Sequence, residues 1–376
     1  MKNVKLKILI TLCILFNASF LFSQDVGVYV SDAGSFDNPP WFVYQFDENG
    51  ENPVELLNES DGINWPCEIL FIDEDDTVLV SNSYQNGTIQ RFSATTWEFI
   101  DNFAEGLNGP TRLKIGPDGY VYVTQWFSNQ DRVLRYETDG TFVDVFTDFG
   151  SYGALGLDWD SSGNLYVSSY QLSTVQKFDT NGNYIEDFIN TGLDGPSNIF
   201  FDNNGSGDLI VLNWVSGLVK RYDSDGNFVE DLITGVEECE GVDFFPNGDI
   251  LIGVGSTDVV KRYDSDFNFI EDFIAAGTLM TPNSIAIHEG TLIGVEDFKA
   301  KEFSAYPNPV TDILNLSANK EISSVSISNI LGQVIYQANV DSMNSTVDMS
   351  SYSSGTYFVK VKDENGNFGT QKVVKN

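Results

Sequence analysis

The sequence is poor in basic residues, histidine and cysteine, and each shortage argues against a class of function. Its 376 residues include 20 Lys and Arg against 55 Asp and Glu, for a formal net charge of −35. Binding to nucleic acid or to anionic lipid headgroups needs clustered positive charge, so neither is expected as a partner. One histidine and three cysteines offer no His-based zinc motif. A Gly-x-Ser-x-Gly elbow and a phosphate-binding loop are also missing.

Long stretches of helix-forming residues with a 3.6-residue period are missing as well. Instead, 33 glycines and recurrent clusters of Asn, Asp and Ser separate short apolar runs. Hydrophobic residues make up 41% and aromatic residues 13% of the chain, which is enough to build a packed core. The composition therefore predicts an all-β protein.

Residues 1–23 differ from the rest of the chain. Three lysines precede an apolar run from Ile8 to Leu15, and small and aromatic residues follow. This pattern predicts a secretory signal peptide that is cleaved near Ser23–Gln24. The apolar run is shorter than the ~20 residues of a membrane-spanning helix, and we expect no transmembrane segment in the mature chain. Export permits a disulfide between Cys67 and Cys239, although the sequence does not show that they meet.

A β-rich unit recurs every 41–44 residues. Five copies of one strand share an apolar fourth residue, and each is followed by a second strand that ends in an aromatic, a turn and a third strand. A proline often precedes the next unit. The fourth residues are Val80, Val123, Val167, Val211 and Ile252. Four strands per ~40–45 residues are typical of a β-propeller blade, and blades must stack around an axis to bury both of their faces.

The units begin near residues 66, 110, 153, 196, 240 and 282, which predicts six blades. The last unit supplies its inner strand, and residues 291–295 are a further candidate strand of the same blade. N-terminal strands near residues 26–30, 42–46 and 54–57 complete that blade and close the ring without free edges. The sequence thus predicts a six-bladed β-propeller over residues 24–300.

These repeats resemble the NHL-type six-bladed propellers and, more loosely, the streptogramin-lyase and gluconolactonase propellers. The resemblance covers roughly residues 25–298. It implies the fold, but one fold hosts many activities, so it does not specify a function.

Residues 302–376 follow another pattern, because apolar and polar residues alternate in a segment rich in Ser, Asn and Val. The alternation predicts a small antiparallel β-sandwich. Four blocks resemble the type A C-terminal sorting domain of Bacteroidetes type IX secretion cargo: YPNP at 306–309, NILGQV at 329–334, SGTYFVKV at 354–361 and QKVVK at 371–375. The resemblance implies handling by the type IX secretion machinery, removal of the tail, and a product that is secreted or held at the cell surface. An ordinary adhesive or carbohydrate-binding sandwich is the alternative.

Charge separates the two regions. Residues 302–376 carry five lysines against seven acidic residues, whereas residues 24–301 carry 12 basic against 48 acidic residues. Such a field repels polyanions and can attract cations or basic peptides. The alternative is that the carboxylates are solvated turn residues that keep an exported protein soluble.

In a propeller, the inner strand begins and the second strand ends on the same face, at the mouth of the central channel. Aligning the inner strands by their apolar alternation places six positions around this mouth. They are Glu68, Arg112, Ala154, Asn198, Gly241 (with Glu240 before it) and Ser284.

Aromatic residues follow the second strands. Trp126, Tyr170 and Trp214 lie three residues beyond the shared apolar position, and Tyr84 lies beside the matching place in the first unit. Amides and hydroxyls precede them. Such a ring suits a small molecule, a glycan or a peptide; the alternative is that the aromatics only cap the blades. The candidate ligand-binding residues are Tyr84, Trp126, Tyr170, Trp214, Arg112, Gln125 and Asn213.

The gluconolactonase resemblance implies a divalent ion held in the channel by oxygen ligands, which suit Ca²⁺ or Mg²⁺. Glu240-Gly241 resembles the opening Glu-Gly of that family, and Pro282-Asn283 resembles its Pro-Asn. The candidate metal ligands are Glu68, Asn198, Glu240 and Asn283. The family's catalytic aspartate has no match here, and Arg112 at the same mouth repels a cation.

The main prediction is therefore an exported or cell-surface binding propeller. The alternative is an oxygen-ligated divalent-metal hydrolase (lactonase-like) or a lyase, and a purely structural scaffold is a third possibility. The streptogramin-lyase family uses histidines at its mouth, whereas the lone His288 is predicted at the far end of the last inner strand, in a structural role.

Overall fold

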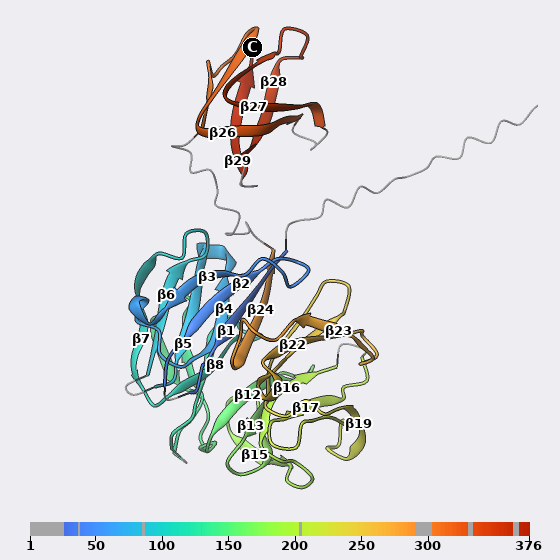
Figure 1. Ribbon diagram of the computed structural model, residues 1–376. Coiled ribbons are helices and arrows are strands. Elements are labelled where there is room, and N and C mark those ends of the chain that lie inside the picture. Colours follow the sequence, from blue (N-terminus) through green and yellow to red (C-terminus); the bar gives the residue numbers. More distant parts are fainter. Residues whose placement is uncertain are drawn as a thin grey trace, which may run out of the picture.

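The computed structural model describes residues 26–36, 38–84, 87–128, 130–202, 205–289, 303–329, 334–363 and 368–376 (Figure 1). The predicted signal peptide and residues 291–295 lie outside these ranges. Within them the chain forms β-strands and three short 3₁₀ turns, without an α-helix. The turns are η1 (Glu59–Asp61), η2 (Asp73–Asp75) and η3 (Gly255–Thr257).

Six four-stranded antiparallel sheets make up the larger part of the molecule. Blade 1 contains β4 (Pro66–Ile72), β5 (Thr77–Asn82), β6 (Gly87–Ser93) and β7 (Phe99–Leu107). Blade 2 contains β8 (Pro110–Ile115), β9 (Val121–Gln125), β10 (Leu134–Tyr136) and β11 (Phe142–Val145). Blade 3 contains β12 (Ala154–Trp159), β13 (Leu165–Ser169), β14 (Thr174–Phe178) and β15 (Tyr184–Ile189). Blade 4 contains β16 (Pro196–Phe201), β17 (Leu209–Asn213), β18 (Leu218–Tyr222) and β19 (Phe228–Thr234). Blade 5 contains β20 (Cys239–Phe244), β21 (Ile250–Val254), β22 (Val259–Tyr263) and β23 (Phe269–Ile274). Blade 6 contains β24 (Pro282–Glu289), β1 (Val26–Asp32), β2 (Phe42–Phe46) and β3 (Val54–Asn58).

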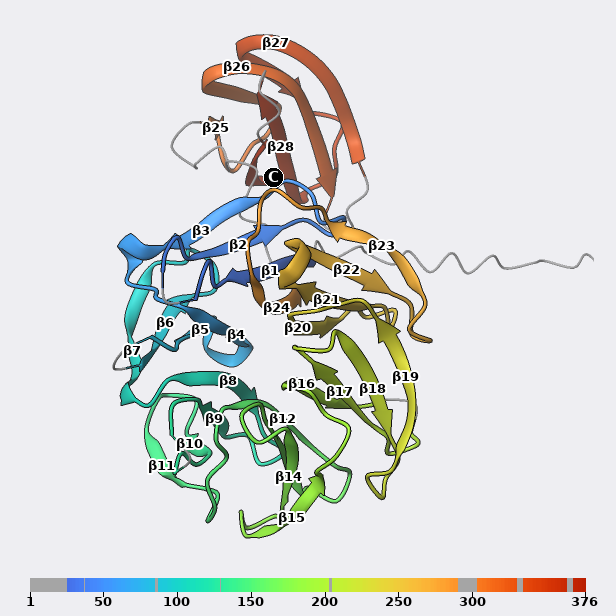
Figure 2. The same ribbon diagram turned by 60° about the horizontal axis from the view of Figure 1, so that its bottom comes forward.

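The six sheets are arranged as a wheel, with β4, β8, β12, β16, β20 and β24 nearest the axis (Figure 2). Blade 6 closes the wheel, because β24 from the end of the repeat pairs along its length with β1 from the start of the chain. This arrangement confirms the predicted all-β, six-bladed propeller and the predicted source of its last blade.

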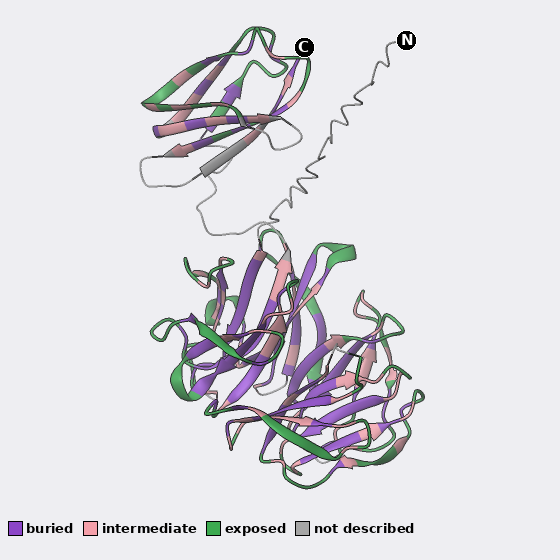
Figure 3. Cartoon of the chain, turned by 90° about the vertical axis from the view of Figure 1, so that its right-hand side faces the viewer, coloured by how far each residue is buried: buried purple, intermediate pink, exposed green. Residues whose placement is uncertain are grey.

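The hydrophobic core lies in the gaps between successive blades. Each of six buried clusters joins side chains from two neighbouring sheets; one of them packs Val43 and Leu57 of blade 6 against Val78 and Phe92 of blade 1. Burial runs along the strands, while the outermost strands are exposed on one side (Figure 3). Because each blade needs a neighbour on both faces, the closed ring leaves no blade with an uncovered side.

The C-terminal region forms a separate five-stranded antiparallel sheet that folds into a small sandwich. Its strands are β25 (Phe303–Tyr306), β26 (Ile313–Asn329), β27 (Val334–Asp348), β28 (Gly355–Asp363) and β29 (Phe368–Lys375). The long strand β26 pairs with β25 in its first half and with β28 in its second half, and its register shifts between Ser317 and Ile322. This shift lets one strand belong to two layers of the small antiparallel sandwich that the alternation in the sequence predicts.

Candidate functional site: a channel divided by Arg112

One hydrogen bond repeats at the mouth of all six blades. A residue just beyond the second strand, which we call the slot residue, donates its backbone N–H to the carbonyl of the residue that precedes the inner strand. The six pairs, slot residue first, are Ser83–Trp65, Trp126–Gly109, Tyr170–Gly153, Trp214–Gly195, Gly255–Glu238 and Ala33–Thr281. The distances from nitrogen to oxygen are between 2.8 and 3.1 Å. The bond fixes both positions at the rim of the channel.

In blades 1 to 5 the two positions of the pair are complementary in size. Where the slot holds Trp126, Tyr170 or Trp214, the partner is a glycine, and a Cβ at Gly195 would lie 2.7 Å from Cε2 of Tyr170 in the preceding blade. Where the slot is small, as in blades 1 and 5, the partner is Trp65 or Glu238. Both of these residues keep the positive φ of the glycines that they replace, a conformation that is strained for a large side chain. Blades 1 to 5 thus each place one large side chain at the mouth.

These aromatic side chains enclose one cavity, which we call the aromatic pocket. It has a volume of about 240 Å³ and is lined by Phe36, Trp65, Trp126, Tyr170 and Trp214, together with Cys67, Thr111, Leu155 and Glu240. The five rings follow one another around the mouth. Their centroids are 5.4 Å apart from Trp126 to Tyr170, 6.1 Å from Tyr170 to Trp214, 6.4 Å from Trp214 to Phe36 and 5.5 Å from Phe36 to Trp65. These spacings are those of edge-to-face and tilted aromatic pairs.

The structure brings Trp126, Tyr170 and Trp214 together but places three other candidate ligand residues elsewhere. Tyr84 lies one residue past the slot, which Ser83 occupies, and its ring packs 6.2 Å from Trp41. The Gln125 side chain is buried and bonds to the backbone of Asn108 and Arg132. The Asn213 side chain is fully buried and bonds to the backbone of Asp194, Val211 and Leu218. The two amides therefore hold loops rather than line the cavity.

Arg112 crosses the channel beneath the aromatic pocket. Its Nη2 donates to Oε1 of Glu240 at 3.0 Å and to the carbonyl of Asn283 at 2.9 Å, and its Nη1 donates to the carbonyl of Cys67. Oε2 of Glu68 lies 3.5 Å from Nη1. We call Arg112, Glu68 and Glu240 the hub; all three side chains are largely buried.

Small residues around the channel make room for this side chain. Register with the second strands shows that the residues level with Arg112 are Glu68, Gly156, Asn198, Gly241 and Ser284. The alignment of the repeats in the sequence placed Ala154 in this ring. That placement is wrong by two positions, because Gly156 is the residue of blade 3 that lies level with Arg112. The error arises because blade 3 has no proline before its inner strand to mark the start. Two glycines among six positions leave the space across which the guanidinium reaches.

Burial is the largest influence on the pKa values of the two hub carboxyl groups. It raises the pKa of Glu240 to about 7, with Arg112 opposing and Glu68 adding to the rise. Burial also raises the pKa of Glu68, against the lowering effects of Arg112 and of a 2.5 Å hydrogen bond from Ser284. Two carboxyl groups that share one guanidinium leave one negative charge in excess when both are ionised, so the pair holds a proton more tightly than free carboxylates do.

The predicted metal ligands do not fit a divalent cation in this arrangement. The carboxylates of Glu68 and Glu240 face a guanidinium, so a metal would have to displace a fixed positive charge. The Asn198 Nδ2 donates to the carbonyl of Glu240, and its Oδ1 accepts from the Ile199 backbone. The Asn283 amide nitrogen bonds to Pro66 and Cys67, and its buried Oδ1, which has no hydrogen-bond partner among the residues that the structure describes, is the one amide oxygen of the set that is not engaged. Within the described ranges no three His, Cys, Asp or Glu side chains form a metal-binding group.

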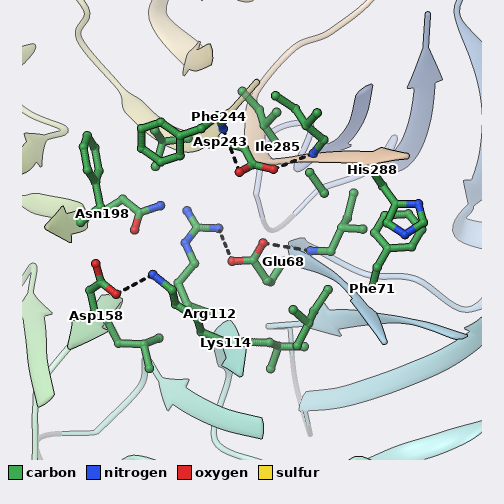
Figure 4. A pocket seen from close by; sticks show the side chains of 18 of the residues that line it. Glu68, Phe71, Arg112, Lys114, Asp158, Asn198, Asp243, Phe244, Ile285 and His288 are labelled. Atoms are coloured by element: carbon green, nitrogen blue, oxygen red, sulfur yellow. Dashed lines mark hydrogen bonds and ion pairs between the residues drawn. The ribbon is translucent and has the colours of Figure 1, made fainter. Parts of the chain in front are cut away.

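The channel beyond Arg112 widens into a second, polar cavity of about 570 Å³, which we call the polar chamber (Figure 4). Its charged groups are already paired or bonded. Lys114 Nζ lies 2.7 Å from Oδ1 of Asp158, and the buried Asp243 carboxylate accepts from the backbone N–H groups of Phe244 and Ile287. Burial raises the pKa of Asp243 to about 6.

His288 lies at the open end of the polar chamber, opposite the aromatic pocket, as the sequence predicts. Its ring stacks on Phe71 at 3.9 Å, and its Nε2 lies 2.8 Å from Oδ1 of Asp73 (Figure 4). Cys67 and Cys239 are separate, buried, free thiols, so they form no disulfide.

The sequence prediction missed Phe36 and Trp65. Trp65 carries a usable signal, because it stands directly before a proline where two other units have Gly109 and Gly195. A bulky residue in the place of a repeated glycine points to a side chain that is needed there. Phe36 lies in the loop between β1 and β2 and belongs to no repeated position, so nothing in the period could reveal it.

Comparisons with known proteins identify the C-terminal region. A family model described as "Secretion system C-terminal sorting domain" matches residues 304–376. A search of curated proteins found no match. No helix among the described residues is long and apolar enough to cross a membrane.

Solved structures share the propeller fold at low sequence identity. The structure titled "Crystal structure of Nidogen/Laminin Complex" is 17% identical, covers 70% of this chain and 98% of its own, and has a TM-score of 0.57. A protein of unknown function from Bacteroides caccae is 14% identical with coverage of 70% and 98% and a TM-score of 0.55. A putative 6-phosphogluconolactonase from Bacteroides fragilis NCTC 9343 is 12% identical with coverage of 71% and 98% and a TM-score of 0.50. At such identities the likeness shows the fold alone.

Fold and sorting domain together define the class: this is an exported all-β protein with a six-bladed propeller. More specifically, its C-terminal domain is a sorting domain of the Bacteroidetes type IX secretion system, so the protein is delivered to the cell surface or secreted.

Proposed function

We propose that the propeller is an extracellular binding module whose ligand enters the aromatic pocket. The observation that carries the proposal is the convergence of five rings from blades 6, 1, 2, 3 and 4 on one cavity at a single face of the wheel. Packing of a propeller does not require these rings to meet. Rings with limited rotamer freedom supply contact area at low entropic cost.

The size of the pocket limits the ligand. Its volume of about 240 Å³ is below the ~300–1,000 Å³ typical of sites for drug-sized ligands. It therefore suits a small molecule, or one terminal group of a glycan or a peptide. We further propose that the mature chain begins near residue 24 and that the tail from residue 302 is removed after export.

The lactonase-like alternative has less support from the site. Its chemistry needs carboxylates that are available to a metal or a substrate, whereas Glu68 and Glu240 are bonded to Arg112. In the polar chamber, Asp158 is paired with Lys114 and Asp243 is bonded to two backbone amides.

The proposal is tested by screening the secreted protein against glycan and peptide arrays and a panel of small organic compounds. A double variant, Trp126→Ala with Trp214→Ala, removes two walls of the pocket and should abolish the binding that the wild type shows. Phe228→Ala removes an exposed ring from the outer edge of blade 4, outside the pocket, and should leave binding unchanged. Equal binding by the double variant and the wild type would contradict the site.

A further inference from the structure

Resting on the proposed function, we propose that the ligand of the aromatic pocket is a small methylated ammonium compound. The pocket combines aromatic walls on most of its circumference with carboxylates on the remaining side. The walls come from Phe36, Trp65, Trp126, Tyr170 and Trp214, and Glu240 of blade 5 supplies the carboxylate among the lining residues. Glu238 stands at the rim of the same blade, where its backbone N–H and carbonyl bond to Trp214 and Gly255.

At the mouth, blade 5 has acidic side chains where the other blades have aromatic rings. Its slot residue is Gly255, and a Cβ there would lie 3.1 Å from Oε2 of Glu238. Glu238 stands at a φ of +60°, in the place where three other blades have glycine. The slot of blade 5 is thus covered by the Glu238 carboxylate, and the Glu238 backbone is held in a strained conformation.

Several carboxylates act on the same side of the pocket. Burial raises the pKa of the Tyr170 hydroxyl, and the negative charges of Asp194, Glu240 and Glu238 raise it further. None of the described residues that line the pocket is a lysine or arginine. The hub beneath it holds two carboxyl groups for one guanidinium. When both carboxyl groups are ionised, a positive ligand above the hub compensates the one negative charge in excess.

The shortage of hydrogen-bonding groups selects a methylated cation over a primary amine. A primary ammonium group has three N–H donors that need acceptors when it is buried. The oxygen acceptors on lining side chains are Glu240, the Tyr170 hydroxyl and Thr111, and the Thr111 hydroxyl already bonds to Thr124 and to the carbonyl of Ala154. A quaternary ammonium needs no acceptor and binds to aromatic faces through its charge.

The test is a titration of the full secreted chain with choline chloride and with 3,3-dimethyl-1-butanol, which has the same shape without the charge. Binding is followed by calorimetry and by tryptophan fluorescence, since Trp65, Trp126 and Trp214 line the pocket. We expect choline to bind at least about tenfold more tightly than the neutral alcohol, because each favourable ring contact and each carboxylate adds to the preference.

Two variants separate charge from shape. Glu238 lies at the rim rather than in the hub, so the Glu238→Gln variant should fold. It should lower the affinity for choline several-fold and leave the affinity for the alcohol unchanged. Trp214→Leu keeps an apolar wall and should weaken choline more than the alcohol. Glu48→Gln, an exposed turn substitution outside the pocket, should leave both affinities unchanged.

Each outcome decides the proposal. Tighter binding of choline that depends on Glu238 and Trp214 supports it. Equal binding of choline and the alcohol overturns the cation assignment while the pocket stands as a binding site. Binding of neither probe also overturns it; if the array and compound screen finds a pocket ligand, only the cation assignment fails, and if the screen is negative too, the proposed function fails with it.

Discussion

The two ends of the central channel are built from the same six inner strands, yet they differ in chemistry. At the mouth, rings with few hydrogen-bonding groups surround a cavity of about 240 Å³. Beyond Arg112, a cavity of about 570 Å³ is lined by charged groups that are mostly paired or bonded to backbone. The charged groups of the larger cavity are therefore mostly satisfied, whereas the smaller cavity is lined mainly by aromatic rings. The volume of a cavity alone does not identify a binding site. The chemistry of the lining side chains is the better indicator.

Arg112 separates the two ends, and its removal should give the largest effect. Arg112→Met leaves Glu68 and Glu240 buried without their cation, and breaking a buried ion pair in this way costs about 3–5 kcal/mol of unfolding free energy. Chemical denaturation of the purified protein measures this loss. Adding Glu240→Gln to the variant should restore part of it.

A surface pair provides the control for Arg112. Lys261→Met breaks a 2.6 Å contact with Asp272, whose side chain is 49% exposed, and such pairs contribute less than about 1 kcal/mol. A loss of similar size in both variants would contradict the view that the hub is a buried charge network.

The complementary slot pairs predict the next largest effect. Gly195→Ala places a methyl group at a φ of +64°, 2.7 Å from Tyr170 and 2.8 Å from Val215. We expect a loss of about 1–3 kcal/mol in the unfolding free energy together with weaker ligand binding, because the Tyr170 ring must move.

Gly106→Ala is the matched control for the slot pair. Its φ is +68°, but a Cβ there meets no atom within 4 Å. Gly106→Ala should therefore lose the part of the unfolding free energy that comes from backbone strain, and it should leave ligand binding unchanged. If both variants bind equally well, the position of the Tyr170 ring does not matter for the ligand.

The hub also predicts a pH dependence of stability. The folded pKa of Glu240, about 7, is above its ordinary value, so the folded state holds the proton more tightly and stability falls as pH rises through about 7. The groups that act on Glu240 or sense its charge are Arg112, Glu68, Cys67, Cys239 and Tyr170. Thermal unfolding from pH 5 to pH 8 should show a Tm that falls by a few degrees, and Glu240→Gln should flatten the fall. An unchanged slope in the variant would assign the effect to other groups, such as Asp243.

The smallest effect is expected at the far end of the polar chamber. His288→Ala removes a ring that stacks on Phe71 and a 2.8 Å contact of its Nε2 with Asp73, whose side chain is 79% exposed. We expect a loss of less than about 1 kcal/mol and unchanged binding at the aromatic pocket. A variant that folds normally but loses ligand binding would show that the two ends are coupled.

The two ends also differ in how far the sequence could predict them. The repeat period located the blades, their closure and the aromatic residues of the slots, because each repeats at a fixed distance from a buried valine. Ala154 was misplaced because blade 3 lacks a proline before its inner strand. Tyr84 lies beside the slot, as predicted, but it does not line the pocket because Ser83 occupies the slot of blade 1. The direction of the Arg112 side chain could not be predicted, because it depends on Glu240 and Asn283, which are 128 and 171 residues away along the chain. The metal prediction rested on the gluconolactonase resemblance and did not include that long-range contact.

Which end of the channel takes the ligand can be seen directly in a crystal soaked with arsenocholine, a choline analogue whose arsenic atom scatters anomalously. An anomalous peak enclosed by Trp126, Tyr170 and Trp214 on the side of Glu240 is the predicted result. A peak below Arg112, beside Asp158 and Asp243, would contradict it.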